Sequence, residues 1–154
     1  MPIIERRRIE AELLREVYRT LVERMGVDEA KEVIRESVKR SAVTQAGQFA
    51  KTLPEGTSLK AFIDIQKYWT AEDALEIREV GRSETTFDFD VTRCRYAEMY
   101  RAMGLGEIGP LLSCNRDGAF CEGFDPRLKM TRTQTIMQGA SHCDFRYRWD
   151  SGEV

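Results

Sequence analysis

Residues 74–92, with the sequence ALEIREVGRSETTFDFDVT, decide the fold class because the spacing of apolar residues changes here. Five apolar residues of this stretch alternate with charged or polar ones, namely Leu75, Ile77, Phe87, Phe89 and Val91. Strict alternation is typical of half-buried strands, and Gly81 with Arg82 supplies a turn between two of them. The stretch therefore predicts an antiparallel hairpin with its aromatic face inward. Asp88 and Asp90 would share the outer face, where we expect solvent rather than a bound cation.

Upstream of the hairpin, apolar residues recur every three or four positions, which is the spacing of amphipathic helices. The predicted helices begin near Ile9, at a capping Asp28 and at Thr57 or Ser58, and the first two end at Gly26 and Pro54. The basic run of Arg6, Arg7 and Arg8 is interleaved with glutamates on the first helix. We expect this run to be a solvated helix face rather than a phosphate site.

Downstream, a helix is predicted from Arg95 to Met103, and Pro110 suits the first turn of another. Strand character then returns in the threonine-rich residues Leu128–Met137 and in the alternating residues Cys143–Trp149. Helices followed by a hairpin, a helical connection and more strands predict an α+β fold. The expected architecture has amino-terminal helices packed on a small antiparallel sheet of about four strands with a helical crossover.

Length and composition set limits on the kind of protein. The 154 residues fit a single domain, 1–154, with a helical part over 1–70 and a sheet and site-bearing part over 71–154. Lys+Arg number 24 and Asp+Glu 26, so we expect no nucleic-acid or membrane partner and favour a small-molecule partner. The amino-terminal helices could also pair two copies into a homo-oligomer. With no long apolar run and no signal core, a cytoplasmic location is expected.

Residues 111–147 hold three of the four cysteines and the only histidine. Cys114 and Cys121 are seven positions apart, which on a continuous helix is about 10.5 Å along the axis. One zinc ion could not take both, because Zn–S bonds are about 2.3 Å long. Gly118 could break the helix and bring the thiols together, so zinc is the alternative to the expected absence of a metal or other cofactor.

Adjacent residues His142 and Cys143 would point to opposite faces of a regular strand. His142 would then share its face with Asp144, a carboxylate that could orient a histidine base. Arg132 lies among Thr131, Thr133 and Thr135, and its guanidinium suits a two-pronged contact with a substrate carboxylate. Arg95 and Arg116 are rivals for that role.

Three blocks of the carboxyl-terminal half are similar to one enzyme family. They are CRYAEMYRAMGLGEIGPLLSCNRD at 94–117, EGFDPRLKMTRTQT at 122–135 and CDFRY at 143–147. The blocks resemble the L-2-amino-thiazoline-4-carboxylic acid hydrolase family. The resemblance implies a bacterial-type hydrolase that opens a cyclic isothiourea on a route to cysteine.

Hydrolysis of such a ring requires attack at the amidine-like carbon, a proton for the departing atom and an anchor for the carboxylate. In one version Cys114 is a covalent nucleophile activated by His142. Asp117 or Glu122 would then hold the amidinium edge. In another version His142 or a carboxylate activates water directly. The predicted substrate-binding residues are Arg132, Arg116 and Asp144.

The cysteine placement is also similar to that of the small-molecule-binding domain of the 4-vinyl reductase type. That likeness implies a different class of function, a non-enzymatic module that binds a small molecule or a metal.

Overall fold

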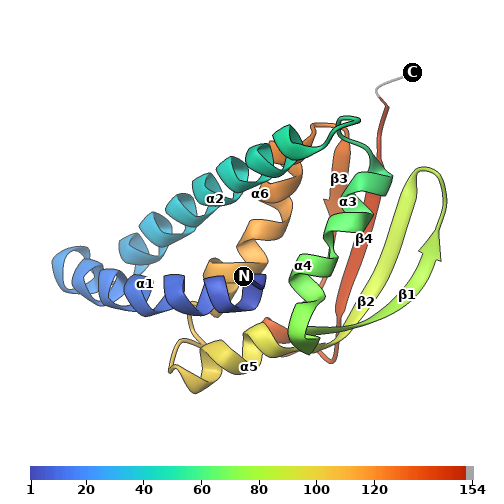
Figure 1. Ribbon diagram of the computed structural model, residues 1–154. Helices are drawn as coiled ribbons and strands as arrows, with labels where there is room; N and C mark the ends of the chain where they lie inside the picture. The colour runs from blue at the N-terminus through green and yellow to red at the C-terminus, as the bar shows by residue number, and fades with distance from the viewer. Residues whose placement is uncertain (152–154) are drawn as a thin grey trace.

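The protein combines two long helices with a four-stranded antiparallel sheet in the computed structural model, which describes residues 1–151 (Figure 1). The elements in chain order are α1 (Ile3–Met25), α2 (Val27–Thr52), α3 (Leu59–Ile65), α4 (Lys67–Thr70), η1 (Ala71–Asp73), β1 (Leu75–Arg82), β2 (Thr86–Cys94), α5 (Arg95–Ala102), η2 (Pro110–Cys114), α6 (Asn115–Phe124), β3 (Leu128–Thr131), η3 (Ile136–Gln138) and β4 (Cys143–Trp149). The predicted α+β class is confirmed. Within the described residues, no helix is both long and apolar enough to cross a membrane.

The strands are arranged in the order β1-β2-β4-β3, with every neighbouring pair antiparallel. The chain leaves β2 through α5 and α6 before returning as β3, which is the predicted helical crossover. Phe89 lies opposite Phe145 in the β2–β4 register, and their rings stack at 5.0 Å between centroids. The aromatic face is turned toward the helices, as predicted, and Tyr147 contacts Phe62 of α3 with 4.7 Å between ring centroids.

The hairpin turn falls at 83–85, so the predicted turn at Gly81 and Arg82 is wrong. The Ser83 hydroxyl accepts hydrogen bonds from the backbone N–H groups of Thr85 and Thr86, which closes the turn beyond Arg82. Gly81 instead lies in β1 beside an irregularity in the strand register. A glycine inside a strand commonly marks such a bulge.

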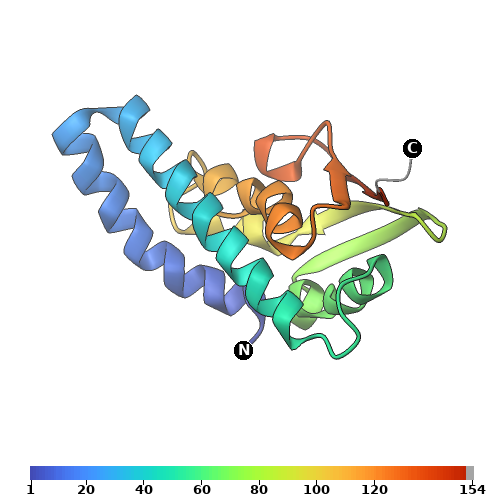
Figure 2. The same cartoon turned by 90° about the horizontal axis from the view of Figure 1, so that it is seen from above.

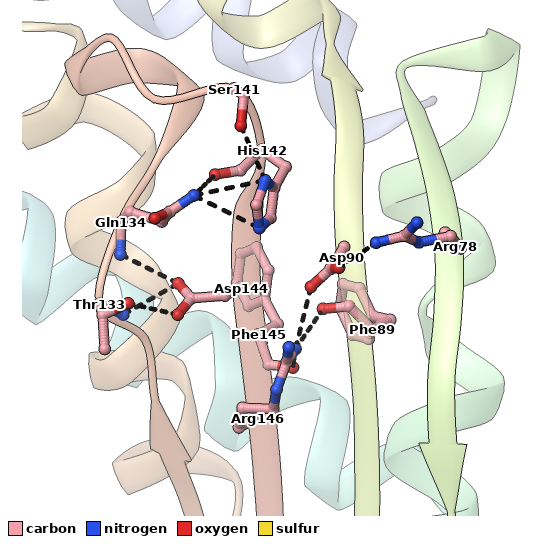
Figure 3. Close-up of polar contacts among 10 residues, drawn as sticks. All are labelled: Arg78, Phe89, Asp90, Thr133, Gln134, Ser141, His142, Asp144, Phe145 and Arg146. Atoms are coloured by element: carbon pink, nitrogen blue, oxygen red, sulfur yellow. Dashed lines mark hydrogen bonds and ion pairs between the residues drawn. The ribbon is translucent and has the colours of Figure 1, made fainter.

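Asp90 is buried, with 3% of its surface exposed, so the predicted solvated face is wrong at this position. Its carboxylate accepts hydrogen bonds from Arg78 at 2.8 Å and from Arg146 at 3.1 Å (Figure 3). The bond from Arg78 contributes most to lowering the pKa of Asp90. The guanidinium groups of Arg78 and Arg146 therefore shield the Asp90 carboxylate, which the alternating pattern predicts to be exposed to solvent.

Arg7 is buried at 3% exposure, while Arg6 and Arg8 on either side of it are exposed. The predicted solvated face is thus right for Arg6 and Arg8 and wrong for Arg7. Arg7 lies on the side of α1 that faces α2 and donates to Gln45 at 3.0 Å. A run of three like residues on a helix necessarily spans more than one face, because successive residues are about 100° apart.

Two predicted element boundaries also change. Helix α2 begins directly after Gly26, whose φ of 85° suits glycine, so Asp28 lies in the first turn and does not cap the helix. Of the predicted strand Leu128–Met137, only β3 is a strand. The backbone N–H groups of Thr133 and Gln134 donate to the Asp144 carboxylate, which draws the chain out of the sheet ladder.

Helices α1 and α2 form a long antiparallel pair whose joined end projects away from the sheet (Figures 1 and 2). Helix α6 packs against α2 so closely that Gly123 lies against the backbone of Val43. Gly118, which could have broken this helix, lies within α6. This packing places the first turn of α6 beside α1, where the candidate site lies.

Candidate functional site

A cavity of about 70 Å³ lies between the inner face of the sheet and the helices α1, α5 and α6. Its chemically active lining comprises the guanidinium groups of Arg7, Arg116 and Arg132, the carboxylate of Asp117, and the thiols of Cys94, Cys114 and Cys143. A second compartment of about 50 Å³ adjoins it and adds Gln45 and Gln66. The two compartments share six lining residues, namely Arg7, Trp69, Leu75, Arg116, Asp117 and Phe145. They are therefore neighbouring parts of one internal space.

Asp117 stands on the first turn of α6 and lines both compartments. Its Oδ2 accepts a hydrogen bond from Arg132 at 2.6 Å, and Arg132 also donates to the carbonyl of Cys114 at 3.2 Å. The Asp117 side chain keeps 27% of its surface accessible, although protein atoms surround it closely. Burial raises the pKa of Asp117, while the charge of Arg132 opposes that rise. Asp117 is thus a carboxylate of increased basicity with access to the cavity.

Glu10 of α1 joins two of the buried arginines. It accepts from Arg116 at 2.9 Å and from Arg7 at 3.1 Å. Arg116 also donates through Nε to the carbonyl of Leu112 at 2.9 Å. Burial, followed by the neighbouring charge of Arg7, lowers the pKa of Arg116 to about 10. Arg116 remains a cation at neutral pH, so this wall of the cavity is positively charged.

The three thiols of the cavity are held in their neutral form. Burial raises the pKa of Cys94 to about 11 and raises that of Cys143. Burial and then the Asp117 charge raise the pKa of Cys114 to about 12. Cys94 accepts a hydrogen bond from the Ala97 N–H at the start of α5. A thiolate nucleophile requires the opposite environment, one that stabilises negative charge on sulfur.

His142 lies just before β4, outside the cavity lining, and Figure 3 shows its ring below Ser141 and beside Gln134. Its Nδ1 lies 2.9 Å from the Ser141 hydroxyl, and its backbone carbonyl accepts from Gln134 at 3.0 Å. Within residues 1–151 no hydrogen bond joins His142 to Cys114. The structure therefore does not form the predicted nucleophile and base pair.

Asp144 and Glu122 also lie away from the cavity lining. Asp144 accepts hydrogen bonds from the hydroxyl and N–H of Thr133 and from the N–H of Gln134 (Figure 3). Burial raises the pKa of Asp144, but these bonds outweigh it and lower the pKa to about 2. Glu122 is exposed on α6. Of the predicted site residues, the cavity brings together Cys114, Arg116, Asp117 and Arg132.

An outer groove of about 760 Å³ runs between α6 and β3. Cys121 and Glu122 line this groove, whereas Cys114 and Arg132 line both the groove and the cavity. Cys114 and Arg132 thus separate the inner space from the surface. Among residues 1–151, no group of three or more His, Cys, Asp or Glu side chains is placed to hold a metal ion.

Arg7 and Gln45 were not predicted as site residues. Arg7 was assigned to a solvated run, and its contact with Gln45 spans 38 positions of sequence. Gln45 offered a usable signal, because it is a polar residue beside Ala42 and Ala46 in the buried stripe of α2. A polar side chain on the buried face of a helix requires a partner there, and that partner is Arg7.

Comparison with known proteins gives a matching family and several solved structures of similar fold, two of which are described here. The sequence profile of the L-2-amino-thiazoline-4-carboxylic acid hydrolase family matches residues 6–147. No curated protein matches the chain. The phenol-responsive sensory domain of the transcription activator PoxR, solved with phenol, has a TM-score of 0.55 at 14% identity, over 93% of this chain and 74% of that one. Trafficking protein particle complex subunit 3 from Naegleria fowleri, covalently bound to palmitic acid, has a TM-score of 0.54 at 13% identity, over 93% and 96%. At these identities the likeness shows the fold alone.

Proposed function

The chain belongs to the L-2-amino-thiazoline-4-carboxylic acid hydrolase family, and we propose that it hydrolyses a small cyclic isothiourea or amidine that carries a carboxylate. The observation that carries the proposal is the placement of Asp117, an accessible carboxylate on the cavity wall that is held by Arg132 at 2.6 Å. In this proposal Asp117 activates water, and Arg132 positions Asp117.

The geometry of Asp117 suits acid–base chemistry. Arg132 occupies Oδ2, whereas within residues 1–151 Oδ1 accepts no hydrogen bond and is left for a water molecule. A raised pKa makes a carboxylate a better base and lets it return the proton. Asp117 would take a proton from water as the oxygen bonds to the amidine carbon. It would then deliver that proton to the ring nitrogen or sulfur as the ring bond breaks.

Cys114 is assigned a supporting place on the cavity wall. Its pKa of about 12 keeps the sulfur protonated, and the structure brings no imidazole to it. We therefore expect Cys114→Ser to retain turnover within about tenfold, since the water mechanism makes no bond to sulfur. Steady-state kinetics, with intact-protein mass spectrometry to detect an adduct on sulfur, would measure this. A loss of turnover above about a hundredfold in Cys114→Ser, or a covalent adduct on Cys114 in the parent protein, would support the mechanism in which Cys114 is the nucleophile.

The size of the cavity favours a single small ring. Neither compartment reaches the roughly 150 Å³ of a cavity that binds benzene, but they share walls and together approach it. We expect incubation with 2-aminothiazoline-4-carboxylate to yield a product heavier by one water molecule, detected by mass spectrometry. Bicyclic amidines should give no product because they exceed the space. Absence of ring opening both with this compound and with a panel of other monocyclic amidines and isothioureas would remove the hydrolase proposal.

A second candidate function is non-enzymatic binding of a small molecule. The observation that favours it is the apolar part of the cavity wall, which includes Trp69, Val91 and Phe145. The two solved structures of similar fold carry phenol and covalently bound palmitic acid. Under this reading, an uncharged aromatic molecule such as phenol would bind and remain unchanged. Calorimetric titration with phenol, run beside the turnover assay, separates the two functions.

A further inference from the structure

Two buried nitrogen atoms beside the second compartment have no hydrogen-bond partner among residues 1–151. They are Nε2 of Gln45 and Nη1 of Arg116. Gln45 is 4% exposed and Arg116 is 7% exposed, and both line the second compartment together with Arg7. Buried donors are nearly always paired, because leaving one unpaired forfeits its bonds to water. Two such donors on one compartment point to a ligand that accepts hydrogen bonds.

The direction of each donor is fixed by its other contacts. Oε1 of Gln45 accepts from Nη2 of Arg7 at 3.0 Å, and a guanidinium only donates. The Gln45 amide therefore cannot be turned around, and its NH₂ group must point away from Arg7. Arg116 already uses Nε on the Leu112 carbonyl and Nη2 on Glu10, which leaves Nη1 for another acceptor.

The charge of this internal space is also unbalanced. Arg7, Arg116 and Arg132 bring three positive charges, whereas Glu10 and Asp117 bring two negative ones. A buried surplus of positive charge is costly, and a single anion would neutralise it. Paired donors on a guanidinium and an amide match the two oxygens of a carboxylate. A water molecule could fill the donors but would leave the charge uncompensated.

We infer that Arg116 and Gln45, supported by Arg7, form a subsite for the carboxylate of the substrate. The inference deepens the proposed function, and it rests on that function for the identity of the ring. With the carboxylate in the second compartment, the ring lies in the first compartment beside Asp117, which lines both. The subsite thus sets specificity for monoanionic carboxylates over neutral amides. It also assigns the anchoring role to Arg116 and leaves Arg132 to position Asp117.

The test uses two inert probes of one shape, thiazole-4-carboxylate and thiazole-4-carboxamide, titrated into the full chain by calorimetry. We expect the parent protein to bind the carboxylate at least about tenfold more tightly than the carboxamide. Gln45→Glu should weaken carboxylate binding by at least about 30-fold, because an anionic oxygen replaces the NH₂ donor. The new carboxylate can still accept from Arg7, so the thermal unfolding temperature should be maintained.

The matched control is Gln48→Glu, on the same helix and with the same change in net charge. Gln48 is exposed and lies outside both compartments, so carboxylate affinity should stay within twofold. Equal affinity of the parent protein for the two probes would overturn the subsite, and so would unchanged carboxylate binding in Gln45→Glu.

The outcomes also separate the subsite from the proposed reaction. Selective carboxylate binding without ring opening of any substrate supports the subsite and removes the hydrolase function. Ring opening with the same kcat/KM in Gln45→Glu removes the subsite and keeps the hydrolase function.

Discussion

Asp117→Asn is expected to lower kcat for ring opening by about 10²- to 10⁴-fold, which is the usual contribution of a positioned acid–base group. Asparagine keeps the size of the side chain, and its carbonyl oxygen can still accept from Arg132. It cannot accept a proton from water at neutral pH, so attack on the amidine carbon loses its base. Steady-state kinetics with 2-aminothiazoline-4-carboxylate measure the effect, and circular dichroism confirms that the variant is folded.

The pH dependence gives a second readout for Asp117. A base works in its deprotonated form, so kcat/KM should fall as the pH decreases through the pKa of Asp117. Burial raises that pKa, so the fall should occur above the value of about 4 that is ordinary for aspartate. Glu122→Gln is the control, because it makes the same charge change on the exposed side of α6 and should leave turnover within twofold. Substantial turnover by Asp117→Asn would contradict the assignment.

Gly123→Ala is expected to destabilise the fold by about 3 kcal/mol or more, which for a chain of this length lowers the melting temperature by about 6–12 °C. A methyl group at Gly123 would stand 2.8 Å from the Cα of Val43 and closer still to its carbonyl oxygen. These are backbone atoms, which cannot rotate away as a side chain could. Helices α2 and α6 would have to separate. Thermal unfolding followed by circular dichroism measures the loss.

Gly118→Ala is the matched control on the same helix. Nothing lies within 4 Å of a methyl group built at Gly118. Alanine is favoured over glycine in a helix by about 0.8–1.0 kcal/mol, so this variant should be slightly more stable than the parent. Equal melting temperatures for the two alanine variants would show that the α2–α6 contact is not as tight as the structure places it.

The parts of the fold that could be predicted are those set by local pattern. Alternation through Phe87, Phe89 and Val91 is sufficient to specify a strand with one buried face, and Ser58, one of the two predicted starts of the third helix, caps α3. The predictions that are wrong concern polar side chains whose hydrogen-bond partners lie far away in the sequence. Asp90 is buried because Arg78 and Arg146 reach it, and the latter is 56 positions away. No periodicity in a single sequence reports such a pairing.

The site was predictable to the extent that its residues are close in the chain. Cys114 ends η2, and Arg116 and Asp117 lie in the first turn of α6 directly after it, so one short stretch of chain brings all three to the cavity. Imidazole chemistry alone predicts His142 as a base, whereas in the fold Ser141 and Gln134 occupy its hydrogen-bonding groups. The contribution of Gln45 could be read only as a polar interruption of an apolar stripe. Its role depends on Arg7, and the run of three arginines at 6–8 predicts that Arg7 is solvated rather than buried.

The cavity draws on both ends of the chain. The lining residue Arg116 bonds to Glu10, 106 positions away, and Arg7 bonds to Gln45, 38 positions away. The walls of the cavity come together only when α1 packs against α6. A chain in which these two helices are apart therefore does not form the cavity. Binding of a ligand in the cavity and folding of the chain are therefore thermodynamically linked. Any molecule that fills the cavity raises the free energy of unfolding of the whole chain by RT ln(1 + L/Kd), where L is its free concentration.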